Sequence, residues 1–169
     1  MRVRAVVSYD GTDYAGFQRQ VDVPTVQEAI ERALAEIGQE AVRIIGSGRT
    51  DAGVHAAGQV IAFDVSWRHG VAALQRALNA VLPGDIVVSE IKEASHEFHP
   101  RFDAQRRWYR YRVFNGVRRW PMAGRFSLHM PYELDVGAMQ AAAVELVGEH
   151  DFATFGRPPQ GDVTVRRVF

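Results

Sequence analysis

The spacing of hydrophobic positions in the first part of the chain predicts strands and helices in alternation. Residues 25–38 are typical of a helix, because apolar positions recur there every three or four residues. Thr25 and Glu28 form a capping box at its start, and Gly38 is suited to end it. A second helix is predicted over residues 71–84, which finish on a Pro-Gly pair. Apolar runs bounded by turn residues predict strands at residues 2–10, 41–48, 58–65 and 85–94.

The second part of the chain is predicted to hold a strand, a helix and the start of another strand. Residues 106–116 alternate strongly and predict a strand with two different faces. A helix is expected over residues 135–148, with Asp135 as its N-cap and Gly148 as its end. Residues 151–162 are expected to form a loop, after which a strand begins. The predicted faces of the alternating strand are Tyr109, Tyr111 and Val113 on one side, and Trp108, Arg110, Arg112 and Phe114 on the other.

The order of these elements indicates an α+β fold, because strand–helix–strand units are mixed with consecutive strands. The second part loosely repeats the first. We therefore predict an N-terminal α+β half at residues 1–105, which contains the bend described below, and the start of a second α+β half at residues 106–169. The chain stops on an apolar residue just as a strand begins. We expect that the second half is truncated.

Composition narrows the functional classes. The chain has 169 residues, of which 47% are hydrophobic and 24% charged, as in ordinary globular domains. It has no cysteine, which excludes disulfides, thiolate catalysis and cysteine-based zinc sites. No apolar run is long enough for a membrane span, and the first apolar run is too short for a signal peptide. We therefore expect no membrane partner and a cytoplasmic location.

The charge is balanced overall but unevenly distributed. Lys92 is the only lysine, so 19 of the 20 basic residues are arginines, and eight of them fall between Arg101 and Arg125. Arginine suits planar, bidentate recognition of phosphate better than lysine does. A GC-rich genome that favours arginine codons is the alternative explanation for the bias, although it does not explain the clustering.

The stretch "GSGRTDAGVHAAGQV", Gly46–Val60, places an arginine and a carboxylate in a glycine-rich bend between two predicted strands. Glycines allow a backbone to approach a ligand closely. Asp51 in such a bend can act as nucleophile, base or metal ligand. His55 is a poor second metal ligand for such a site, because the bend is not expected to be helical. A phosphate-binding loop is the other option, but the sequence pattern of such a loop is absent. The alternative is a structural ion pair between Arg49 and Asp51 that pins the turn.

The segment "GRTDAGVHAAGQV" resembles the signature of the bacterial tRNA pseudouridine synthase A family. The resemblance extends over the whole chain, because further blocks match in the family's order. The central signature is as specific as a complete catalytic motif. The other matching blocks are "YDGTDYAGFQRQ", "TVQEAIERAL", "NAVLPGDI", "FHPRFDAQRRWYRYRVFN" and "GEHDFATF".

This resemblance implies roles for three residues. Asp51 matches the family's essential aspartate, which makes it the expected nucleophile, with attack on either C6 of uracil or C1′ of ribose. Arg49 is its expected ion-pair partner, since a nearby opposite charge favours the ionised carboxylate. Tyr109 is expected to stack on the uracil ring and is a candidate acceptor for the C5 proton. The alternative for Tyr109 is an aromatic side chain that is merely half-buried in a strand.

Further residues are candidates for binding the RNA. Gln18 and Arg19 resemble part of the family's tRNA-contacting surface, although an exposed turn explains them equally. Arg106 and Arg107 are candidates for phosphate contacts, and a solvated strand face is the alternative. The family's C-terminal segment, whose arginine enters the active site, has no counterpart in this sequence.

Taken together, the resemblance implies an isomerase that converts uridine to pseudouridine in the anticodon stem-loop, at tRNA positions 38–40. It implies a homodimer, no cofactor and no metal. It also implies two similar RRM- or ferredoxin-like halves that share a mostly antiparallel central sheet with helices on one face. The alternative is a non-catalytic RNA-binding fragment that retains the fold without the C-terminal arginine. A metal-dependent nuclease that uses Asp51 and His55 is a third, weaker hypothesis.

Overall fold

A computed structural model describes residues 1–38, 40–155 and 165–169 of the chain. The chain divides into two compact units, Met1–Tyr109 and Arg110–Phe169, each of which is described by itself. The sequence predicted a division between residues 105 and 106. No helix in the described ranges is long and apolar enough to cross a membrane.

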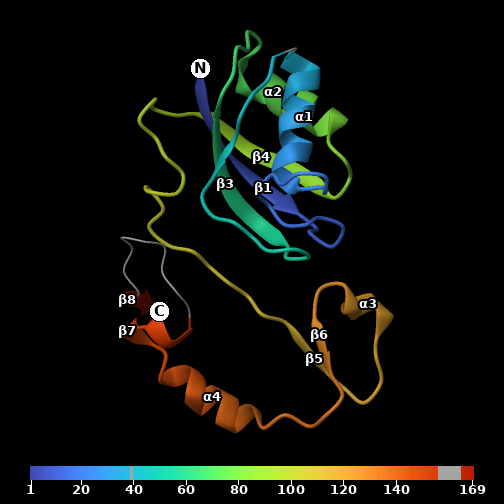
Figure 1. Ribbon diagram of the computed structural model, residues 1–169, viewed down its shortest axis with the longest axis vertical. Helices are drawn as coiled ribbons and strands as arrows, with labels where there is room; N and C mark the ends of the chain where they lie inside the picture. Colours follow the sequence, from blue (N-terminus) through green and yellow to red (C-terminus); the bar gives the residue numbers. More distant parts are fainter. Residues whose placement is uncertain (39, 156–164) are drawn as a thin grey trace. The chain divides into compact units, whose positions relative to one another are not determined.

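The first unit is a four-stranded sheet with two helices (Figure 1). The strands lie in the order β2-β3-β1-β4, and all neighbouring pairs are antiparallel. This order and connectivity are those of the split β-α-β, or ferredoxin-like, arrangement. The elements in chain order are β1 (Arg2–Tyr9), α1 (Val26–Gly38), β2 (Ile45–Gly46), β3 (Ala56–Asp64), α2 (Gly70–Val81) and β4 (Ile86–Glu93).

The core of the first unit lies between one face of the sheet and the two helices. Alternate residues of β1 point into it, because side chains of a strand alternate between its two faces. Val3 pairs with Phe63 across the sheet and Ala5 with Ile61, and all four side chains are buried. The same hydrophobic cluster includes side chains from both helices, namely Val26, Ile30, Ala33, Leu34, Leu74 and Leu78.

The predicted helices of this unit are confirmed. The amide of Glu28 donates a 3.4 Å hydrogen bond to Thr25 Oγ1, so the threonine of the capping box caps α1, and the helix ends at Gly38 as predicted. The second helix ends at Val81, just before the Pro-Gly pair.

The strand predicted over residues 41–48 is shorter than expected, because only β2 pairs with β3. Two side chains of α1 occupy the backbone groups that a longer strand would use. Glu31 Oε1 accepts the amide of Ile44 at 3.1 Å, and Gln27 Nε2 donates to the Ile44 carbonyl at 3.2 Å. Residues before β2 are therefore fastened to the helix instead of extending the ladder.

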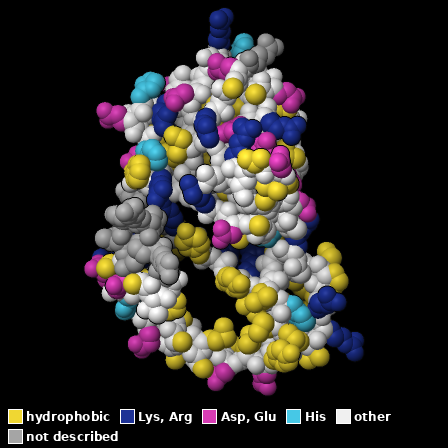
Figure 2. All heavy atoms as spheres, viewed as in Figure 1, with side chains coloured by type: hydrophobic (Ala, Val, Ile, Leu, Met, Phe, Trp, Pro, Cys, Tyr) yellow, Lys and Arg dark blue, Asp and Glu magenta, His cyan; other side chains and the backbone are white. Residues whose placement is uncertain are grey.

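The second unit contains two separate pairs of short strands. Strand β5 pairs with β6 in parallel, and β7 pairs with β8 antiparallel. Figure 2 shows many hydrophobic side chains of this unit at the molecular surface. Its elements are β5 (Val113–Asn115), α3 (Pro121–Gly124), β6 (Leu128–Met130), α4 (Val136–Val144), β7 (Gly148–Asp151), the 3-10 turn η1 (Ala153–Phe155) and β8 (Val165–Val168).

Two sequence predictions about strands in the second part need correction. The strand predicted over residues 106–116 is reduced to β5, and Trp108, Tyr109 and Tyr111 are all more than 80% exposed. No strand of the described ranges lies beside residues 106–112 to pair with them, so alternation alone did not produce a ladder. The predicted shared central sheet is not formed by the described strands either, because these make three separate sheets.

The third predicted helix begins as expected but ends early. Asp135 Oδ1 accepts the amide of Ala138 at 2.8 Å, which confirms the N-cap. The helix ends at Val144, and Gly148 opens β7 instead of ending the helix. The predicted loop at residues 151–162 contains η1, and its later part lies outside the described residues.

Candidate active site

The glycine-rich bend runs along the loop that connects β1 to α1. The amide of Phe17 donates to the Thr50 carbonyl at 3.0 Å, and the amide of Gly53 donates to the Tyr14 carbonyl at 3.2 Å. These two backbone hydrogen bonds hold two segments together that are distant in the sequence. Asp51 lies between them and is therefore presented from a fixed backbone.

The close approach of the two loops requires glycine at position 16. Gly16 has a φ of +103°, which side-chain-bearing residues rarely adopt. A Cβ atom on Gly16 would lie 2.6 Å from the Thr50 carbonyl oxygen. A side chain there would push the bend away from the first loop, which is the loop that connects β1 to α1.

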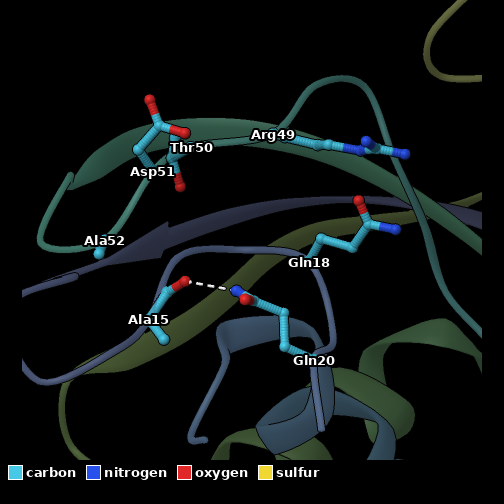
Figure 3. Close-up of a pocket in the computed structure, with 7 residues that line it drawn as sticks. All are labelled: Ala15, Gln18, Gln20, Arg49, Thr50, Asp51 and Ala52. Atoms are coloured by element: carbon cyan, nitrogen blue, oxygen red, sulfur yellow. Dashed lines mark hydrogen bonds between the residues drawn. The ribbon is translucent and has the colours of Figure 1, made fainter.

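The two loops form a pocket of about 350 Å³ (Figure 3). Its wall combines polar side chains from both loops. Asp51 is exposed, and Gln20 is held in place because its Nε2 donates to the Ala15 carbonyl at 2.7 Å. The residues that line the pocket are Ala15, Gln18, Gln20, Arg49, Thr50, Asp51 and Ala52.

The predicted ion pair between Arg49 and Asp51 is not formed. Both side chains line the pocket, but they extend in different directions from the bend (Figure 3). Both are exposed, so water solvates each charge and no packing holds the two ends together. The pairing hypothesis therefore has no support from this geometry, although the two residues do share the pocket.

The two residues predicted near the first loop have different surroundings. Gln18 lines the pocket, whereas Arg19 is held by α1. A guanidinium nitrogen of Arg19 lies 3.5 Å from Glu31 Oε2, and its backbone amide donates to Gln27 Oε1 at 3.1 Å. The structure thus brings Gln18 to Asp51 and ties Arg19 to the helix.

The residues predicted from the alternating segment are not gathered in the pocket. Tyr109 is 86% exposed and does not line it. Arg106 is also exposed. Arg107 Nη2 donates to the Ser47 carbonyl at 3.0 Å and to the Arg101 carbonyl at 3.3 Å. Arg107 is therefore attached to the start of the bend through backbone oxygens.

The metal hypothesis gains nothing from the structure. His55 Nδ1 lies 2.9 Å from Asp10 Oδ1, so the histidine is held by that carboxylate. No group of three metal-ligating side chains occurs within the described part of the chain.

Sequence reasoning missed a hydrogen-bonded group beneath the bend. The hydroxyl of Tyr9 lies 2.8 Å from Thr50 Oγ1 and donates to Gln59 Oε1 at 3.2 Å, while Gln59 Nε2 donates to the Gly48 carbonyl at 2.9 Å. Burial raises the pKa of Tyr9 above its usual value. A glutamine inside the otherwise apolar run of β3 was the available signal, because a polar side chain in such a run needs a partner.

A family model described as tRNA pseudouridine synthase matches residues 5–103, more than half of the chain. The chain belongs to the tRNA pseudouridine synthase family. The match covers the four-stranded sheet of the first unit, except for the first three residues of β1, together with the bend and the pocket. Family membership confirms the resemblance inferred from the signature.

Individual members of this family align over nearly the whole chain. The tRNA pseudouridine synthase A of Geotalea uraniireducens is 45% identical over 99% of this chain and 69% of its own length. The enzymes of the same name from Limosilactobacillus fermentum and Brevibacillus brevis are 44% and 47% identical, over 99% and 91% of this chain and 66% and 63% of their own lengths. The chain thus spans about two thirds of the length of these curated relatives.

Proposed function

We propose that the chain isomerises uridine to pseudouridine in tRNA, with Asp51 as the nucleophile. Membership of the tRNA pseudouridine synthase family supports the reaction and the substrate class. The observation that supports the residue is its position. Asp51 stands in the wall of the pocket, on a bend whose backbone is fastened at Thr50 and Gly53. A fixed nucleophile beside a pocket avoids much of the entropy cost of aligning the reacting atoms.

The reaction breaks the bond between ribose C1′ and uracil N1, turns the base and joins C1′ to C5. Asp51 forms a temporary covalent bond, at C6 of the ring or at C1′ of the ribose, which is released when the product forms. The C5 proton leaves in the last step, and N1 gains a proton. The conversion is redox-neutral and rearranges the atoms of one nucleotide, so the chemistry calls for no electron carrier.

The target uridine must leave its stack to reach the pocket. Extrusion of a base costs a few kcal/mol, which contacts in the pocket must offset. A volume of about 350 Å³ lies within the range of about 300–1,000 Å³ found for small-ligand sites. Gln18 and Gln20 supply amide groups on the side opposite the bend, which suits the hydrogen-bonding edge of a pyrimidine.

Tyr109 remains our proposal for the stacking partner of the uracil ring. Its side chain is 86% exposed, so it is accessible to an extruded base. Because Asp51 is exposed as well, the dry surroundings that favour the covalent step must come from the bound nucleotide and from side chains that close over it.

The family resemblance supports finer proposals. We propose that the substrate site is the anticodon stem-loop, at tRNA positions 38–40, and that the protein acts as a homodimer in the cytoplasm. Exposed arginines such as Arg106 then contact phosphates, which positions the RNA without selecting its sequence.

Tritium release from unmodified tRNA labelled at C5 of uridine tests the proposed function. We expect release by the wild-type chain, and a loss of more than about a hundredfold in Asp51→Asn, with tRNA affinity unchanged within about threefold. Asp22→Asn is the matched control, because Asp22 is an exposed loop aspartate outside the pocket. It should release tritium as the wild type does.

Three outcomes would contradict the proposal in different ways. Full activity of Asp51→Asn would show that Asp51 is not the nucleophile. Loss of tRNA binding together with activity would make the aspartate structural. Tight tRNA binding by the wild-type chain with no release would favour the non-catalytic RNA-binding fragment instead.

A further inference from the structure

We propose that Tyr9 and Gln59 are positioning residues that fix the bend on both sides of Arg49 and thereby aim Asp51 into the pocket. This inference rests on the proposed function for its catalytic consequence. Its structural part concerns the hydrogen bonds beneath the bend and stands on them alone.

The donors and acceptors of this group form one consistent chain. The Tyr9 hydroxyl donates its proton to Gln59 Oε1 at 3.2 Å, so the 2.8 Å contact with Thr50 Oγ1 is donated by the threonine. Gln59 Nε2 then donates to the Gly48 carbonyl at 2.9 Å. The bend is therefore held at Gly48 through its backbone and at Thr50 through its side chain.

The anchor of this group is rigid because it belongs to the core of the first unit. Tyr9 ends β1, is only 4% exposed, and packs its ring against Phe17 with 6.2 Å between ring centroids. Phe17 is also buried, and its amide donates to the Thr50 carbonyl. Thr50 is thus held twice, through its hydroxyl by Tyr9 and through its carbonyl by Phe17.

Close packing leaves this group little freedom to shift. A Cβ atom on Gly46 would lie 2.6 Å from Phe17 Cε1 and 2.9 Å from Gln59 Nε2. The backbone of β2 therefore rests directly on both side chains. A bend supported in this way presents the residue after Thr50, which is Asp51, in one place.

Loss of the Tyr9 hydroxyl should displace the bend while the fold of the first unit stays largely intact. Tyr9→Phe keeps the buried ring but leaves Gln59 Oε1 and the Thr50 hydroxyl without their shared partner. A displacement of about 1 Å at the reacting group costs about a hundredfold in rate. We expect kcat to fall about 10- to 100-fold with KM nearly unchanged, since the pocket wall retains its side chains.

Tyr14 offers a matched control in the same loop system. Its hydroxyl donates to Asp85 Oδ1 at 2.8 Å, and its backbone carbonyl accepts the amide of Gly53 in the bend. Tyr14→Phe removes one phenolic hydroxyl without touching the Tyr9 group. Thr50→Val deletes the Tyr9 bond from its other end, and Thr50→Ser retains it.

Amide hydrogen exchange of the 169-residue chain tests the structural part without any assay of activity. Exchange at Phe17, whose amide is bonded to the Thr50 carbonyl, should rise at least about tenfold in Tyr9→Phe and in Thr50→Val. It should stay within about twofold of the wild type in Tyr14→Phe and Thr50→Ser. Exchange at Asp10, whose amide is bonded to the Asp85 carbonyl, should instead rise in Tyr14→Phe and stay near the wild-type rate in Tyr9→Phe and Thr50→Val.

The kinetic part uses the tritium-release assay on the same variants. If the wild-type chain releases no tritium, the proposed function has failed, and the exchange pattern still decides whether Tyr9 fixes the bend. Unchanged exchange at Phe17 in Tyr9→Phe, or an equal rise in Tyr14→Phe, would overturn the structural part. A wild-type kcat in Tyr9→Phe, or a change confined to KM, would overturn the catalytic part.

Discussion

The two units of the chain differ in what their secondary structure buries. All the hydrophobic core residues of the described chain lie between Val3 and Ile91. Within the described part of the second unit, no side chain is buried, and even Trp120 and Leu146 are 55% and 46% exposed. Both units contain helices and strands, so the presence of elements does not by itself indicate a packed core.

The difference shows what a regular element needs in order to bury its apolar side chains. In the first unit, helices α1 and α2 supply a second layer over the sheet, and each strand has a neighbour. In the second unit, β5 and β6 pair only with each other, and residues 110–112 have no described strand beside them. Local signals such as the Asp135 cap can start a helix, but burial requires a facing layer.

The largest expected difference between the two units is the loss of stability when one leucine in each is replaced by alanine. Leu78→Ala removes a side chain that is 0% exposed in α2 and should lower the free energy of unfolding by about 2–5 kcal/mol. Leu146→Ala, the same change at a 46% exposed position, should lower it by less than about 0.5 kcal/mol. Urea unfolding followed by circular dichroism, which reports on the helices of both units, measures both changes, and Trp67 fluorescence, with Trp108 and Trp120 replaced by Phe, follows the first unit alone.

Equal effects of the two substitutions would contradict the comparison. A small effect of Leu78→Ala would mean that the core tolerates the cavity. A large effect of Leu146→Ala would mean that this leucine is buried in solution.

Where local chemistry and a packed partner agree, the sequence was sufficient to predict structure. Helix α1 follows from the spacing of its apolar face and from Thr25, and β1, β3 and β4 follow from their apolar runs. The candidate site was proposed in the same way, because a glycine-rich bend with both Arg49 and Asp51 exceeds what a plain turn needs. The family signature then indicated which of the two charges is the expected nucleophile.

What the sequence did not predict depends on contacts between distant residues. The shortened β2 results from Glu31 and Gln27 of α1, which bond to Ile44 across the fold. Arg49 and Asp51 do not pair because both side chains are exposed to solvent, and their closeness in the sequence does not reveal this. The segment around Tyr109 has the alternation that is typical of a strand, but no described strand lies beside it to pair with.

A pair of glycines sharpens the comparison with a smaller effect. Gly16 and Gly148 both have positive φ, but only Gly16 faces a fixed backbone oxygen, the Thr50 carbonyl at 2.6 Å from an added Cβ. Gly16→Ala should lower the stability of the first unit by about 1–3 kcal/mol. Gly148→Ala strains the second unit and should leave the Trp67 transition unchanged. A shift of that transition by Gly148→Ala would show that the two units unfold together.

The smallest expected effect concerns tyrosines and alkaline pH. Burial raises the pKa of Tyr9, and burial together with the Asp85 carboxylate raises that of Tyr14. Above the ordinary tyrosine pKa of about 10, the unfolded chain therefore loses protons that the folded chain retains, so stability falls as pH rises. This contribution is fully present below a pH of about 10 and is lost as pH climbs through the raised folded-state pKa values.

The test compares the slope of stability against pH, between about pH 10 and 11, in the wild type and in two phenylalanine variants. Tyr9→Phe and Tyr14→Phe should each make the slope shallower, by up to about 1 kcal/mol over that interval. A wild-type slope in both variants would mean that the packed unit does not shield these hydroxyls from water, and the contrast between a packed and an exposed unit would then fail at these positions.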